Sequence, residues 1–170
     1  AQKNPQKAIE IHKEALKISK EFDFKNGIIE SYVNLGEDYL ALNNIAKAYQ
    51  MLFSGLEIAR NVNRKPKIAS VLISIAKTYV YDHKNNPRDN LILTENIGLT
   101  DNDIEEYLKE ANVLADEMKN AQYKMSALKG LHLLYQKTEN SVANTRILTE
   151  LLNLKDTIFS NEYQTSIADW

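Results

Sequence analysis

Histidine is the side chain in this sequence best suited to bind a metal or move a proton near neutral pH. The three histidines, His12, His83 and His132, lie far apart in the chain. None has the His-Glu-x-x-His spacing that would place two ligands on one helical face. The sequence therefore predicts no metal site, and each histidine is expected to pack on or near a helix surface.

Carboxylates are the next candidates for acid–base work, and Glu105, Glu106 and Glu110 lie close together in the sequence. Adjacent residues of a helix point in different directions, so we expect a solvated helix face. Cysteine is absent, and neither a Gly-x-Ser-x-Gly elbow nor a glycine-rich phosphate loop occurs. We therefore expect no catalytic residue and no cofactor.

The charge balance bears on the kind of partner. Lys and Arg number 21 against 23 Asp and Glu, which gives a formal net charge of −2 with both signs mixed along the chain. Nucleic acids and anionic membranes require a basic face. We therefore expect no nucleic acid and no direct membrane contact.

Helices suit the hydrophobic pattern better than strands. Apolar residues recur every three or four positions, and only 5 Gly and 3 Pro interrupt the chain. Asn4 and Pro5 begin a helix predicted over 5–22. A turn over 23–27 leads to a second helix over 28–42, and a third follows over 45–61.

The sequence repeats with a period of 40 residues. A large apolar residue, a small residue and, three positions later, a tyrosine occur twice: Leu35, Gly36 and Tyr39 return as Ile75, Ala76 and Tyr79 (75 − 35 = 40). Farther on the shift becomes 56, because Gly55 matches Ala111 and Tyr79 matches Tyr135 (135 − 79 = 56). Helix pairs therefore repeat, with 16 extra residues (56 − 40) in one of them.

The extra residues fall at 85–102. Their apolar side chains, which are Leu91, Ile92, Leu93, Ile97 and Leu99, predict a segment that folds back on the helices and helps to form a binding surface. Asn102 stands three residues before Glu105, the spacing of a capping box, and is predicted to restart the helix.

Small residues are needed where the two helices of a pair touch. Gly36, Ala48 and Gly55 are predicted to meet in one pair, with Ala76 and Ala111 in the next, and the repeat tyrosines fill the space between pairs. His132 and Leu151 occupy the small positions of the last pair. We expect a wider crossing or a capping role there.

Leu35, Gly36 and Tyr39, followed by Ala48, Leu52 and Gly55, resemble the tetratricopeptide repeat in its 40-residue form. The resemblance implies an all-α fold, a right-handed solenoid of antiparallel helix pairs with about seven helices and no catalysis. The predicted units are the second helix of repeat 1 (5–22), repeat 2 (28–61), repeat 3 (66–119), repeat 4 (121–160) and the start of a connecting helix (161–170). The partner of the first helix is missing, so Ile11, Ala15 and Ile18 are expected to be bare and open to self-association.

Resemblance to peptide-binding repeats also implies a groove along the first helix of each pair. Its predicted residues are Glu30, Val33, Glu37 and Leu40, then Ser70, Ile73, Lys77 and Tyr81, then Ser126, Lys129, Leu133 and Gln136. Repeats that clamp a carboxyl terminus use Asn and Lys or Arg at matching positions, and this chain has Glu37, Lys77 and Leu133 in place of the Asn. We therefore do not expect recognition of a terminal carboxylate.

The stretch from Leu154 to Glu162, running on to Trp170, is similar to the segment that closes the repeat arrays of membrane-anchored regulators of Bacteroidetes. In those proteins a helix leads toward a transmembrane span and a histidine kinase or helix-turn-helix output. This resemblance implies the sensor or scaffold region of a bacterial signalling protein, in the periplasm or another extracytoplasmic space. The alternative is a stand-alone cytoplasmic adaptor.

Overall fold

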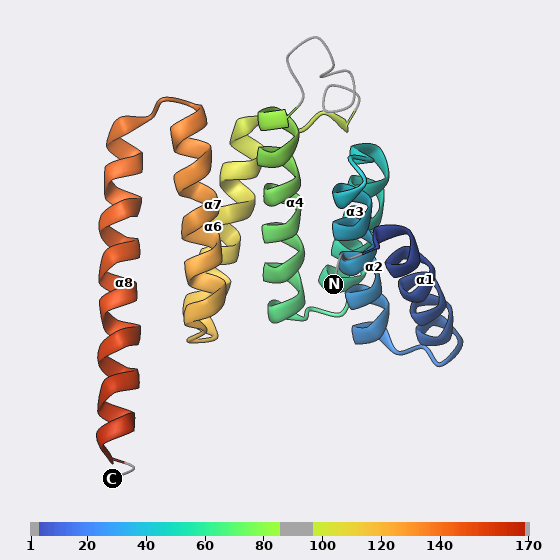
Figure 1. Cartoon of the computed structure of the whole chain (residues 1–170), viewed down its shortest axis with the longest axis horizontal. Helices are drawn as coiled ribbons and strands as arrows, with labels where there is room; N and C mark the ends of the chain where they lie inside the picture. The colour runs from blue at the N-terminus through green and yellow to red at the C-terminus, as the bar shows by residue number, and fades with distance from the viewer. Residues whose placement is uncertain (1–3, 86–96, 169–170) are drawn as a thin grey trace.

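The computed structural model of the chain describes residues 4–85 and 97–168, without the side chains of 159 and 161–168. The described residues form helices and no strand, which confirms the all-α prediction. The helices are α1 (Pro5–Glu21), α2 (Lys25–Ala41), α3 (Ile45–Asn61), α4 (Lys65–Asn85), α6 (Asp101–Glu117), α7 (Ala121–Lys137) and α8 (Ser141–Ala168). They follow one another from α1 at one end of the molecule to α8 at the other, and consecutive helices run in opposite directions (Figure 1), while α4 also contacts α2 and α7.

Five of the helices are 17 residues long: α1, α2, α3, α6 and α7. Each ends in a short turn that holds one residue in the left-handed backbone conformation, namely Asp23, Asn43, Asn63, Lys119 and Glu139. The amide after that residue donates back to a carbonyl five residues earlier, as Asn44 N does to Tyr39 O at 2.8 Å. This bond closes the helix end and reverses the chain.

The turn geometry corrects the predicted start of the second helix. Because Asp23 takes the left-handed position, α2 begins at Lys25 rather than at residue 28. Gly27 therefore lies inside the first turn of α2 and is buried. A Cβ there would lie 2.5 Å from Cδ1 of Phe24 and 2.6 Å from Oγ of Ser19, so glycine permits the close approach of α1.

The predicted capping box at Asn102 and Glu105 is wrong. Thr100 is the N-cap of α6: its hydroxyl accepts from Asp103 N at 3.2 Å, and Asp103 Oδ2 accepts from Thr100 N at 2.7 Å. Asn102 lies inside the helix, at its second residue. The same spacing of three residues occurs twice, and the hydroxyl at Thr100 forms the box.

The core runs between the helices from α2 to α8, with a smaller cluster of Ile9, Leu35, Tyr39 and Ala48 near α1. Gly36 of α2 packs on α3, since a Cβ there would lie 2.7 Å from Cγ of Leu52 and 3.4 Å from Ala48 O. Gly55 meets a different part of α2, where its Cβ would lie 3.2 Å from Cβ of Tyr32. Gly36 thus packs beside the backbone of Ala48, whereas Gly55 meets α2 at a separate point.

The remaining structural positions are buried, and they include Ile75, Ala76, Tyr79, Ala111 and Tyr135.

Of the predicted insertion, 86–96 lie outside the described residues. Ile97 and Leu99 are half-buried against the core. On α1, Ile11 and Ile18 are exposed, as expected for a bare face, while Ala15 is half-buried. The connecting helix predicted to start at 161 is not a separate element, because α8 continues through this position without a break.

Candidate binding site

The helices α2, α4 and α7 are the first members of their pairs, and α4 contacts both of the others. They carry the twelve predicted groove residues. A pocket of about 360 Å³ opens between α4 and α7. Six of the predicted residues line it: Ile73, Lys77 and Tyr81 from α4, with Ser126, Lys129 and Leu133 from α7.

The floor of this α4–α7 pocket is apolar. Ile73, Ala76 and Leu108 are buried beneath it, whereas Tyr81 and Leu133 stand at its edge with 37% and 46% of their surfaces exposed. Gly130 lets α7 come down onto α6, because a Cβ there would lie 2.5 Å from Cδ2 of Leu108. The volume is near the low end of the roughly 300–1,000 Å³ of ligand pockets. It suits one or two large side chains.

Lysine is the charged residue at this pocket. Lys77, Lys84 and Lys129 line it and are exposed, and no Asp or Glu is among its lining residues. The described part of the chain offers none of the three an ion pair. The arrangement therefore joins an apolar floor to three unneutralised positive charges.

The other predicted groove residues do not join this pocket. Glu30 forms an ion pair with Lys67, Glu37 is exposed, and Val33 and Leu40 are half-buried on α2. Ser70 and Gln136 also lie outside the pocket lining. The repeat pattern thus predicted the residues of α4 and α7 that line the pocket. The pocket itself does not reach the predicted groove residues of α2.

Two kinds of lining residue were missed by sequence reasoning. Val80 and Lys84 continue the stripe of Ile73, Lys77 and Tyr81 along α4, so the helical period contained a signal for them. Leu108 comes from α6, the second helix of its pair, and no sequence pattern in the groove positions points to it.

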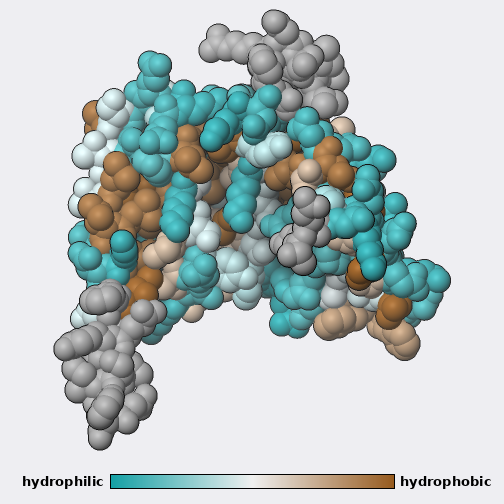
Figure 2. Space-filling model, viewed as in Figure 1, coloured by the Kyte–Doolittle hydropathy of each residue, from teal (hydrophilic) through white to brown (hydrophobic). Residues whose placement is uncertain are grey.

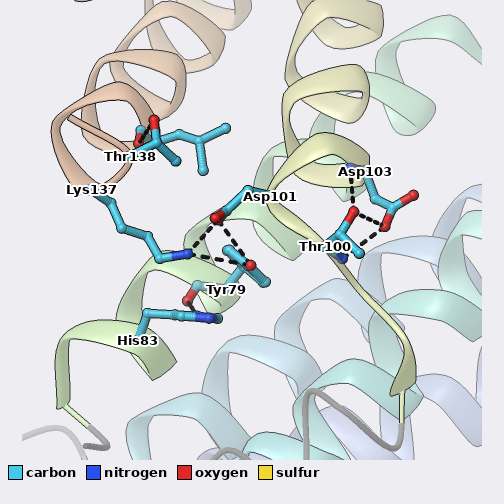
Figure 3. Close-up of polar contacts among 8 residues, drawn as sticks. Tyr79, His83, Thr100, Asp101, Asp103, Lys137 and Thr138 are labelled. Atoms are coloured by element: carbon cyan, nitrogen blue, oxygen red, sulfur yellow. Dashed lines mark hydrogen bonds and ion pairs between the residues drawn. The ribbon is translucent and has the colours of Figure 1, made fainter. Parts of the chain in front are cut away.

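A polar cluster lies at the ends of α4, α6 and α7 (Figure 3). The hydroxyl of Tyr79 donates to Oδ1 of Asp101 at 2.9 Å, and Lys137 pairs with Asp101 while its Nζ lies 4.8 Å from the Tyr79 ring centroid. The ring of His83 contacts that of Tyr79 in a tilted arrangement, with an interplanar angle of 37° and a centroid distance of 4.0 Å. Burial, and next the bond to Asp101, raise the pKa of Tyr79. The protonated hydroxyl of Tyr79 is a hydrogen-bond donor, and its bond to Asp101 joins the first turn of α6 to α4.

The other two histidines also join neighbouring helices. Nδ1 of His12 lies 2.6 Å from Oδ2 of Asp38, and Nδ1 of His132 lies 2.6 Å from Oδ1 of Asn144. The Lys109 side chain, 2.6 Å from Oε1 of Glu105, lowers the pKa of that carboxyl group, so Glu105 is not tuned as a general acid. Within 4–85 and 97–168, no three His, Asp or Glu side chains form a group that could hold a metal ion.

A second apolar pocket, of about 360 Å³, lies on the other side of α7. Met125 and Lys129 of α7 line it together with Leu148, Leu151, Leu152 and Lys155 of α8. Leu148 and Leu152 are exposed. Figure 2 shows hydrophobic surface over α7 and α8 on this face. Lys129 borders both pockets.

Comparison with known proteins found no protein-family model that matches the chain and no curated protein that matches it. None of the helices in the described residues is both long and apolar enough to cross a membrane.

Proposed function

We propose that this chain is a tetratricopeptide-type repeat array, coiled as a right-handed solenoid, that binds a peptide or protein segment between α4 and α7 without catalysis. One observation carries the proposal. Of the eight groove residues that the repeat pattern predicts on α4 and α7, six line a single apolar pocket. Residues chosen only by their place in a repeat would not be expected to converge on one pocket by chance.

The helix geometry also supports the repeat assignment. Helices of 17 residues joined by turns of three give modules of 20 residues, and two modules give the period of 40 seen in the sequence. Such pairs bury their apolar faces only against neighbours, and each exposes the first helix on one side.

Selection from a random peptide library displayed on phage would test the binding function. We expect enriched peptides whose affinity falls at least tenfold in Leu133→Ser, because Leu133 is an exposed apolar side chain at the pocket. The matched control is Ile18→Ser on α1, since Ile18 and Leu133 are 47% and 46% exposed. Absence of enriched peptides, or equal loss in both variants, would contradict a groove-binding function.

We further propose that the array serves as the sensor or scaffold region of a bacterial signalling protein, outside the cytoplasm. The support is the resemblance of the segment that begins at Leu154, which lies within the 28-residue helix α8. The coding sequence that follows Trp170 tests this role. A membrane span followed by a kinase or helix-turn-helix output would agree with it, whereas a stop without either would favour a cytoplasmic adaptor.

A further inference from the structure

The two apolar pockets on either side of α7 share one wall, and that wall carries Lys129. Met125 and Leu133 stand four residues before and after Lys129, so the three side chains lie along one face of the helix. Met125 lines the α7–α8 pocket and Leu133 lines the α4–α7 pocket. An apolar surface therefore passes across α7 with a positive charge at its middle.

The charge on this surface is of one sign. The lysines of the two pockets are Lys77, Lys84, Lys129 and Lys155, and neither pocket has an acidic lining residue although the chain holds 23 Asp and Glu. Lys124, a little over one turn from Lys129, shows the contrast. It lies 2.7 Å from Oδ1 of Asp116 and 3.3 Å from Oε1 of Glu150.

Ion pairs thus hold Lys124 between α6, α7 and α8, whereas Lys129 has no carboxylate partner among the described residues. An exposed cation beside apolar surface attracts an anionic partner and orients it during association. A partner that also supplies apolar side chains gains the burial of the pocket floors.

We propose that these two pockets bind an acidic peptide segment with two large apolar side chains, one on each side of α7, and with carboxylates between them that meet Lys129. This proposal rests on the groove-binding function and names its partner. Packed helices lie roughly 8–10 Å apart, so the grooves that flank one helix have about the same separation. A segment in the polyproline II conformation has three residues per turn and advances about 3.1 Å per residue, so two apolar side chains three positions apart point the same way at a separation of about 9 Å.

A dye-labelled peptide would test this directly, with two phenylalanines flanking two aspartates and only glycine and serine elsewhere. We expect fluorescence anisotropy to show saturable binding that weakens as salt is raised. Replacing both aspartates with lysine, or either phenylalanine with serine, should lower the affinity at least tenfold. Equal binding of the acidic and the basic peptide would overturn the proposal.

Variants of the protein locate the binding. Lys129→Glu should lower the affinity at least tenfold, and so should Leu152→Ser in the second pocket. The charge control is Lys13→Glu, an exposed lysine on α1 that causes the same change in net charge. If Lys129→Glu binds the peptide as tightly as Lys13→Glu does, the proposal is wrong.

The test also separates this proposal from the broader binding function. Peptides selected from the random library that depend on Leu133 but carry no acidic residues would leave groove binding intact and overturn the acidic-segment proposal. Laurate, an anion with an apolar tail, serves as a second probe. Binding of laurate without binding of the acidic peptide would likewise overturn it.

Discussion

The helix pairs α2–α3 and α7–α8 hold equivalent places in the repeat but meet through different side chains. Gly36 and Ala48 form the close contact of the first pair, and the positions 96 residues later are His132 and Asn144 (36 + 96 = 132; 48 + 96 = 144). There a hydrogen bond of 2.6 Å replaces contact between small residues. Larger residues hold the last pair by a polar contact, and α8 leaves Leu148 and Leu152 exposed. Loss of small residues thus accompanies an apolar groove.

The strongest test of this comparison is Gly36→Leu. The new side chain would clash with Leu52 of α3, and overpacking of this kind costs roughly 1–3 kcal/mol. For a chain of this size we expect a fall in melting temperature of roughly 2–12 °C, measured by circular dichroism. His132→Leu, at the equivalent position of α7, should lower it much less. If the two substitutions have equal effects, the two pairs do not differ in how closely they pack.

The tyrosines 96 positions apart provide a smaller test. The hydroxyl of Tyr135 donates to Oε1 of Glu105 at 2.8 Å, whereas the hydroxyl of Tyr39 has no hydrogen-bond partner in the described part of the chain. We expect Tyr135→Phe to lower the free energy of unfolding by about 1 kcal/mol and Tyr39→Phe to change it little. Urea titration at neutral pH measures both variants. If Tyr39→Phe lowers the free energy of unfolding more than Tyr135→Phe does, the hydrogen bond of Tyr135 is not the stabilising difference between the two tyrosines.

The smallest expected effect is a difference in alkaline stability. Burial, and next the hydrogen bond to Glu105, raise the pKa of Tyr135 to about 12 in the folded chain. In the unfolded chain the pKa is about 10. The stabilisation is therefore complete below pH 10 and is lost as the pH rises from 10 to 12, because the unfolded state then releases the proton more readily. Tyr135→Phe should flatten the fall of unfolding free energy over this range, which urea titrations at a series of alkaline pH values would measure.

Local sequence signals predicted much of the fold. Asn4, by accepting from Lys7 N at 3.3 Å, caps α1 as its side chain suggested, and α3 has the predicted bounds. The start of α2 was missed because Asp23, rather than a glycine, takes the left-handed conformation. An aspartate at one position does not by itself predict the left-handed conformation.

The lining residues that share one helix face were predicted from the sequence. The lining residues that a neighbouring helix contributes through packing were missed. Lys77 and Lys129 follow from the repeat period alone. Leu108 lies beneath the α4–α7 pocket only because Gly130 brings α7 close to α6. The α7–α8 pocket lies between two helices that the hydrogen bond of His132 and Asn144 joins, and the sequence indicated only that this pair would depart from the others.

The five left-handed turn residues have a consequence for how the sequence can change. All five of these positions favour glycine, yet none of them is a glycine. They are Asp23, Asn43, Asn63, Lys119 and Glu139. Residues other than glycine lose roughly 1–2 kcal/mol in this conformation, although Asn and Asp tolerate it better. Glycine at Lys119 or Glu139 would relieve part of that strain, less the roughly 0.5–1 kcal/mol that its freedom in the unfolded chain costs. The turns thus hold a reserve of stability that could compensate for destabilising substitutions elsewhere, leaving the groove side chains free to diversify.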